Sequence, residues 1–152
     1  MALRDRHPPG SPIAPQPPPI DVLVVDDSAV VRQRLKAIIE SDPHFSVTLA
    51  ADPYEAVAIL SKSVPGVIVL DVEMPRMDGF SLTEAIRDSR RFRDLPVILV
   101  TALESDADKA RGLAAGADAY CVKSAFDQKD LLALIFEQAM GAQRNALRGL
   151  GG

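Results

Sequence analysis

The sequence predicts an α/β fold with a doubly wound, five-stranded parallel sheet flanked by five helices. Short apolar runs rich in β-branched residues recur along the chain, and segments with helical spacing of apolar residues separate them. Strict alternation of strands and helices is typical of parallel sheets with right-handed crossovers. The length of 152 residues and the hydrophobic content of 47% predict one domain with an ordinary core.

Four apolar runs and one segment in which apolar and polar residues alternate predict the strands, and a helical segment follows each of them. The alternating segment is typical of a strand at or near a sheet edge. The predicted strands are residues 22–25, 45–49, 67–70, 97–100 and 119–122. The predicted helices are residues 30–39, 53–62, 80–86 and 105–115, and a last helix that Asp127 caps. The clearest helix start is Asp52-Pro53-Tyr54-Glu55, which combines a capping carboxylate, a first-turn proline and a glutamate three residues after the cap.

Composition divides the chain into three parts. Residues 1–19 are rich in proline and poor in core-forming side chains, so we expect a disordered lead-in. Residues 20–140 hold all the predicted strands and helices and form the expected domain. The apolar spacing is lost from about Gly141, and we expect residues 141–152 to be a flexible tail.

Charge and cysteine content exclude several classes of function. The chain has 17 basic and 21 acidic residues and no basic run, which disfavours direct binding to nucleic acid and favours protein partners. No apolar stretch approaches the roughly 18 residues of a membrane span, and the N-terminus lacks the apolar core of a signal peptide. The single cysteine, Cys121, fits a reducing compartment, so we expect a cytoplasmic protein without membrane insertion.

Polar side chains follow four of the predicted strands at the points where those strands end. Asp26 and Asp27 follow the first strand, Asp71 the third, Thr101 the fourth and Lys123 the fifth. The carboxyl ends of parallel strands meet at one edge of a sheet, and ligands of doubly wound folds bind there. Each residue alone would be a helix cap, a strand residue or a solvated lysine, whereas the set predicts a functional site.

The residue types of this set indicate its chemistry. Three neighbouring carboxylates repel one another unless a cation occupies the site, and oxygen ligands with room for water suit Mg²⁺. A carboxylate can also act as a nucleophile and form an aspartyl phosphate, while Mg²⁺ and a lysine offset charge on the transferring group. The set therefore predicts phosphoryl chemistry, with Asp71 as the central residue, Lys123 as a cation and Thr101 as a hydroxyl that bonds the new phosphate.

These residues and the segments around them resemble the receiver domain of two-component response regulators over residues 20–140. Val-Asp-Asp-Ser-Ala-Val-Val-Arg and Leu-Asp-Val-Glu-Met-Pro-Arg-Met-Asp-Gly are similar to receivers of chemotaxis methylesterases, and Lys-Ser-Ala-Phe-Asp to receivers attached to hybrid chemotaxis-type kinases. The resemblance implies a flavodoxin-like strand order of 2-1-3-4-5. It departs after Lys123, where Ser124 replaces the proline that receivers usually have.

The resemblance implies a role for each residue of the acidic site. Asp26, Asp27, Asp71 and the backbone carbonyl of Glu73 would bind Mg²⁺, with Mn²⁺ as an alternative ion. Asp71 would accept a phosphoryl group from a histidine kinase or a phosphotransfer protein, and Lys123 would contact that phosphate.

The resemblance also implies a signalling switch rather than an enzyme, because such a domain catalyses only its own phosphoryl transfer and dephosphorylation. Thr101 and Tyr120 would be the switch residues, and they would change the protein-interaction face built by the fourth helix, the fifth strand and the fifth helix. A downstream protein or a fused output domain would respond, and phosphorylation could produce a homodimer. The chain would be either a stand-alone adaptor or a receiver fragment of a larger regulator.

Two alternative functions are open at the level of sequence. A receiver-like interaction module could bind its partner without phosphorylation, although retention of all the site residues disfavours this. A flavodoxin-like cofactor binder is disfavoured because Asp26 and Asp27 follow the first strand, where a glycine-rich phosphate loop would be needed.

Overall fold

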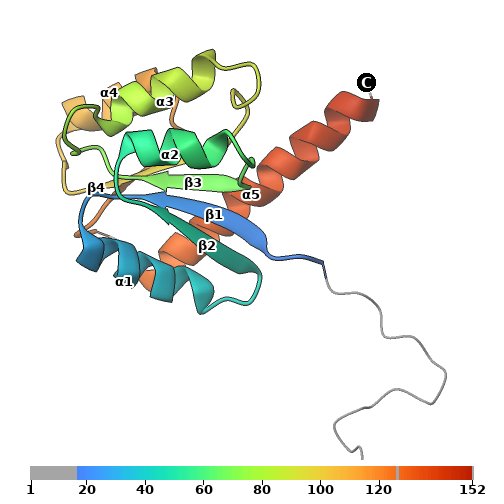
Figure 1. The fold of residues 1–152 in the computed structure, drawn as a ribbon, viewed down its shortest axis with the longest axis horizontal. Coiled ribbons are helices and arrows are strands. Elements are labelled where there is room, and N and C mark those ends of the chain that lie inside the picture. The colour runs from blue at the N-terminus through green and yellow to red at the C-terminus, as the bar shows by residue number, and fades with distance from the viewer. Residues whose placement is uncertain (1–16, 126, 152) are drawn as a thin grey trace, which may run out of the picture.

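The computed structural model describes residues 17–125 and 127–151, and in the last helix it describes side chains as far as residue 142. Over these residues, strands and helices alternate strictly (Figure 1). The strands are β1 (Ile20–Val25), β2 (Phe45–Ala50), β3 (Val67–Leu70), β4 (Val97–Thr101) and β5 (Ala119–Val122). The helices are α1 (Ala29–Glu40), α2 (Pro53–Leu60), α3 (Gly79–Asp88), α4 (Asp106–Ala115) and α5 (Gln128–Gly151). Residues 1–16 of the predicted lead-in lie outside the described residues, and residues 17–19 are exposed.

The sheet is fully parallel and has the order β2-β1-β3-β4-β5, which confirms the predicted fold class. Its register aligns the carboxyl ends of the central strands, because Val25 of β1 lies beside Leu70 of β3, and Leu70 lies beside Leu99 of β4. The residues that follow β1 and β3 are therefore held next to one another.

Two apolar layers fix the sheet between the helices (Figure 1). On one face, α1 and α5 pack through Leu35, Ile39, Leu131 and Ile135, which are all buried. On the other face, α2, α3 and α4 cover a second cluster that includes the fully enclosed Phe80. Alternate residues of each strand contribute to opposite clusters, as a strand buried on both faces requires.

Helix α5 differs from the prediction at its C-terminal end. The sequence predicts a flexible tail from residue 141, whereas the helix continues to Gly151 and extends past the sheet (Figure 1). Residues 141–151 are therefore helical, and the flexibility of this segment stays a prediction. Alanine, glutamine, arginine and leucine dominate the segment after Gly141, and their high helix propensity offsets the cost of single glycines. Among the described residues, no helix is both long and apolar enough to cross a bilayer.

Strand β2 is an edge strand, as its alternating pattern predicts. The Glu40 carboxylate, at the end of α1, accepts a hydrogen bond from the Val47 N–H at 2.9 Å. This amide points away from β1, so a side chain occupies a donor that the edge would otherwise expose.

The amino ends of β4 and β5 are tied together by Arg87, which lies near the end of α3. Its guanidinium donates to the carbonyl of Gly116 at 2.8 Å, to the carbonyl of Leu95 at 2.7 Å and to Asp118 Oδ2 at 2.7 Å. Asp118 Oδ2 also accepts from the Val97 N–H at 2.8 Å. One cation thus joins α3, the start of β4 and the α4–β5 turn.

Candidate functional site

Three carboxylates come together at the carboxyl edge of the sheet. Asp26 and Asp27 follow β1 and Asp71 follows β3, and each offers one oxygen to a group whose members all lie within 4.8 Å of one another. Asp26 and Asp71 are buried, with relative exposures of 2% and 6%, and Asp27 is exposed. Like charges at this separation destabilise one another unless a cation offsets them.

Lys123, directly after β5, places a positive charge beside two of these carboxylates. Its Nζ donates to Asp26 Oδ2 at 3.1 Å and lies 3.6 Å from Asp71 Oδ2. Burial raises the pKa of the Asp71 carboxyl above its ordinary value, while Lys123 opposes this rise and the charge of Asp26 adds to it. One ammonium faces three carboxylates, so the group keeps an excess of negative charge.

The donor set fits a hard divalent cation. All three side-chain donors are carboxylate oxygens, which Mg²⁺ prefers. Opposite ligands of an octahedral Mg²⁺ lie about 4.2 Å apart, so these oxygens need only small shifts to share an ion. Glu73 lies on the same rim, with its N–H 3.4 Å from Asp71 Oδ1. Its carbonyl as a metal ligand stays a prediction.

The backbone around Asp26 is held by two contacts. Asp26 Oδ1 accepts from the Ser28 N–H at 2.9 Å, and Arg32 Nη1 donates to the Asp26 carbonyl at 2.8 Å. The sequence indicates only that Arg32 belongs to the polar side of α1, because a helical pattern does not tell where a long side chain ends. Because the Ser28 N–H holds Oδ1 of Asp26, the other carboxylate oxygen, Oδ2, faces Lys123.

Thr101 ends β4, is fully buried and connects to Tyr120 through one loop residue. Its Oγ1 accepts from the Leu103 N–H at 3.2 Å, and the Leu103 carbonyl accepts from the Tyr120 hydroxyl at 2.9 Å. Sequence reasoning missed Leu103, since a single leucine in a loop has no pattern that marks it. The two predicted switch residues therefore share the backbone of one intervening residue.

The Tyr120 ring packs against Gly112 of α4. A Cβ on Gly112 would lie 2.8 Å from Tyr120 Cδ2 and 3.0 Å from Leu99 Cδ1. A glycine inside a helix costs roughly 1 kcal/mol relative to alanine, and here the close approach of the ring explains its presence. Burial raises the pKa of the Tyr120 hydroxyl, and the charges of Asp108 and Asp71 act in the same direction, so this hydroxyl is a hydrogen-bond donor at neutral pH.

The loop after Asp71 is closed by its last residues. The Gly79 N–H donates to the Val72 carbonyl at 2.8 Å, and a Cβ on Gly79 would collide with the Asp71 carbonyl. Asp78 caps α3 by accepting from the Ser81 N–H at 2.8 Å. Asp78 is therefore the residue at which the loop ends and α3 begins.

The segment after Lys123 forms a tight turn without proline. The Ala125 N–H donates to the Val122 carbonyl at 2.9 Å. No cis peptide bond occurs in the part of the chain that the structure describes, so the Lys123–Ser124 bond is trans. Lys123 thus contacts the carboxylates although Ser124 stands in place of proline.

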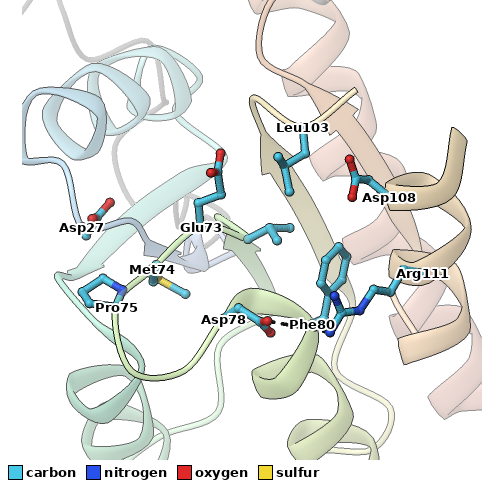
Figure 2. A pocket seen from close by; sticks show the side chains of 10 residues that line it. Asp27, Glu73, Met74, Pro75, Asp78, Phe80, Leu103, Asp108 and Arg111 are labelled. Carbon is cyan, nitrogen blue, oxygen red and sulfur yellow. Dashed lines mark ion pairs between the residues drawn. The ribbon is translucent and has the colours of Figure 1, made fainter. Parts of the chain in front are cut away.

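An open cleft of about 510 Å³ lies beside the acidic group, between the β3–α3 loop and α4 (Figure 2). Asp27 lines one side, and Asp108 and Arg111 line the other (Figure 2). The guanidinium carbon of Arg111 lies 4.6 Å from the centroid of the Phe80 ring, and its Nη2 lies 3.9 Å from Asp78 Oδ2. Arg111 thus links α4 to the start of α3.

Comparison with known proteins gives a consistent match. The family model of the response regulator receiver domain matches residues 22–136. The response regulator Rre1 of Synechocystis is 36% identical over 117 residues, which cover 77% of this chain and 50% of that protein. A protein-glutamate methylesterase/protein-glutamine glutaminase of Hahella chejuensis is 45% identical over 116 residues, which cover 74% of this chain and 31% of that protein. The chain spans half or less of the length of these two curated relatives.

A solved structure agrees with the sequence matches. The receiver domain of a sensor histidine kinase from Pseudomonas aeruginosa, with a magnesium ion coordinated in its active-site cleft, has a TM-score of 0.72 and is 29% identical. The similarity covers 80% of this chain and 98% of that domain. The methylesterase belongs to one of the two classes that the sequence motifs resemble, and the solved structure shows a similar receiver domain of a sensor histidine kinase. Fold, strand order and family match lead to one conclusion: the chain belongs to the response regulator receiver domain family.

Proposed function

We propose that this chain is a phosphorylation-controlled signalling switch in which Asp71 accepts a phosphoryl group with Mg²⁺ as cofactor. Members of the receiver family are signalling phosphoacceptors rather than classical enzymes. The observation that carries the proposal is the meeting of three carboxylates within 4.8 Å, beside an ammonium that lies 3.6 Å from Asp71 Oδ2. We assign this function to residues 20–140.

The chemistry assigns a distinct task to each residue. A carboxylate oxygen of Asp71 would attack the phosphorus of the donor, the bond to the leaving group would break, and the leaving group would take its electron pair. Lys123 would bond an oxygen of the incoming group. When bound, Mg²⁺ would offset the repulsion between the carboxylates and the phosphoryl oxygens. Asp26, Asp27 and the Glu73 carbonyl would hold the ion, and the magnesium in the similar kinase receiver supports this choice.

The hydrogen bonds around Leu103 support a route from the site to the surface. If Thr101 moves to bond the phosphate, its Oγ1 leaves the Leu103 N–H, and the same residue bonds the Tyr120 hydroxyl through its carbonyl. Phosphorylation is a local change of charge that biases an element with two arrangements. The element proposed here is the surface formed by α4, β5 and α5.

Receiver domains interact with histidine kinases and with downstream targets. For this chain we propose a histidine kinase or a phosphotransfer protein as the phosphodonor. A downstream protein or a fused output domain would respond to the altered surface. The single cysteine fits action in the cytoplasm.

Acetyl phosphate with Mg²⁺ tests the proposal directly. Intact-mass measurement should show one added phosphoryl group on the wild-type chain and none on D71N. Chelation of the metal before mixing should also prevent the gain. D88N, which removes an exposed aspartate at the end of α3, serves as the matched control and should gain the group like the wild type. An unmodified wild type, or a D71N chain modified to the same extent, would contradict the proposal.

A further inference from the structure

Arg76, in the β3–α3 loop, has an unusual backbone conformation. Its φ of 72° is positive, and the Met77 N–H donates to the Pro75 carbonyl at 2.9 Å across it. A hydrogen bond between residues two apart around a positive φ defines a rare and strained form of the γ-turn. A residue with a side chain adopts such a conformation only where contacts around it hold it there.

Those contacts come from the first turn of α2. The guanidinium carbon of Arg76 lies 5.0 Å from the centroid of the Tyr54 ring, within the range of a cation–π interaction. Its Nη2 lies 3.9 Å from Asp52 Oδ2. Asp52 is itself fixed as the helix cap, because its Oδ1 accepts from the Glu55 N–H at 2.8 Å. The strained turn is thus attached to a rigid helix start that precedes it in the chain.

The contact of Arg76 with α2 fixes the segment of the β3–α3 loop that directly follows Glu73, Met74 and Pro75. The other end of the loop is tied by the Gly79 N–H, which donates to the Val72 carbonyl. Between these two ties lie only Glu73, Met74 and Pro75. The direction of the Glu73 carbonyl therefore depends on both ties.

We propose that Arg76, through its contact with Tyr54 and Asp52, is a positioning residue for the metal site. It holds the γ-turn so that the Glu73 carbonyl faces the acidic group, and it touches neither the ion nor the phosphate. This inference rests on the proposed function, because it concerns the Mg²⁺ that the proposed function requires.

Titration calorimetry of Mg²⁺ on the full chain tests the inference without any phosphorylation. R76A and Y54A should each weaken Mg²⁺ binding by about two- to fivefold, the range expected for losing one exposed cation–π contact. Y54F keeps the ring and is the matched control, so it should bind Mg²⁺ like the wild type. The R76A/Y54A double variant should bind no more weakly than R76A, since R76A already removes the contacts with both Tyr54 and Asp52.

R76G separates positioning from backbone strain. Glycine accepts a positive φ without a side chain, so R76G should unfold at a higher temperature than R76A yet bind Mg²⁺ as weakly. R76K keeps a cation that can lie over the ring and should restore part of the affinity. Wild-type affinity for Mg²⁺ in both R76G and Y54A would overturn this inference and leave the proposed function standing. A wild-type chain that binds no Mg²⁺ would overturn the proposed function and this inference with it.

Discussion

Charged side chains at the two ends of the sheet differ in how fully they are partnered. At the amino ends of β4 and β5, the guanidinium of Arg87 donates to three backbone carbonyls and one carboxylate at 2.7–3.0 Å. At the carboxyl ends, Asp26, Asp27 and Asp71 lie together, the ammonium of Lys123 contacts Asp26 and Asp71, and the pKa of Asp71 is raised mainly by burial. At the amino end Arg87 is paired with Asp118, whereas the carboxyl end keeps unbalanced negative charge.

This difference in partners indicates that charged groups stabilise the fold at the amino end and destabilise it at the carboxyl end. Charged groups with full sets of partners stabilise a fold, whereas buried like charges destabilise it and attract a ligand of opposite charge. Changes at the amino end should therefore alter the free energy of unfolding. Changes at the carboxyl end should alter cation binding and chemistry more than stability.

The largest effect on stability is expected from R87A. This change removes the Arg87 donors from the carbonyls of Gly116 and Leu95 and from Asp118 Oδ2, which keeps its bond from the Val97 N–H, and it should lower the free energy of unfolding by about 2–3 kcal/mol. Urea denaturation measures this. R90A removes an exposed arginine two residues after the end of α3 and should change stability by no more than about 0.5 kcal/mol. Equal losses of unfolding free energy in R87A and R90A would contradict the claim that the contacts of Arg87 stabilise the amino end of the sheet.

Removal of the Lys123 ammonium should have an effect of intermediate size. It should change the affinity for Mg²⁺ rather than the free energy of unfolding. K123M deletes a positive charge 3.1 Å from Asp26 Oδ2, so Mg²⁺ should bind about fivefold more tightly, or about 1 kcal/mol. Phosphoryl transfer from acetyl phosphate should nevertheless be slower, because the transferring group loses its ammonium. K129M, at an exposed position in the first turn of α5, controls for net charge. Weaker Mg²⁺ binding in K123M would show that the lysine orients the carboxylates more than it repels the ion.

The smallest effect is the pH-dependent gain in stability of D71N without metal. A carboxyl whose pKa is raised by folding binds more protons in the folded chain, so the stability that it contributes is present below the unfolded pKa of about 3.8 and is lost as pH rises through the folded value. D71N removes this loss. Its advantage over the wild type should grow with pH from about 3.8 upward and stay below about 1 kcal/mol, since Lys123 offsets part of the burial cost. An advantage that shrinks as pH rises would contradict the direction of the shift.

Much of the architecture could be predicted because it depends on local patterns. Runs of four apolar residues ended by a polar one located β1, β3 and β4, and the parallel sheet then brought Asp26 and Asp71 together. The cap and proline at Asp52 and Pro53 located the start of α2. The strand order came from the family resemblance and is confirmed.

The remaining features depend on where long side chains end in space. Nothing in the sequence near Arg87 indicates that its partners are the carbonyl of Gly116 and the carboxylate of Asp118, because they lie 29 and 31 residues away. The position of Arg76 over the Tyr54 ring is hidden for the same reason. Helix α5 continues beyond residue 141, where the apolar spacing is lost, because the residues that follow include strong helix formers.

The contact between Glu40 and Val47 has a consequence for the molecule in a crowded solution. An outer strand whose amides are free can template the addition of a strand from another chain, and such addition leads to aggregation. The Glu40 carboxylate occupies one of these amides and places a negative charge at the border of β2. Addition of a strand from another chain is thereby opposed at the Val47 position of this border.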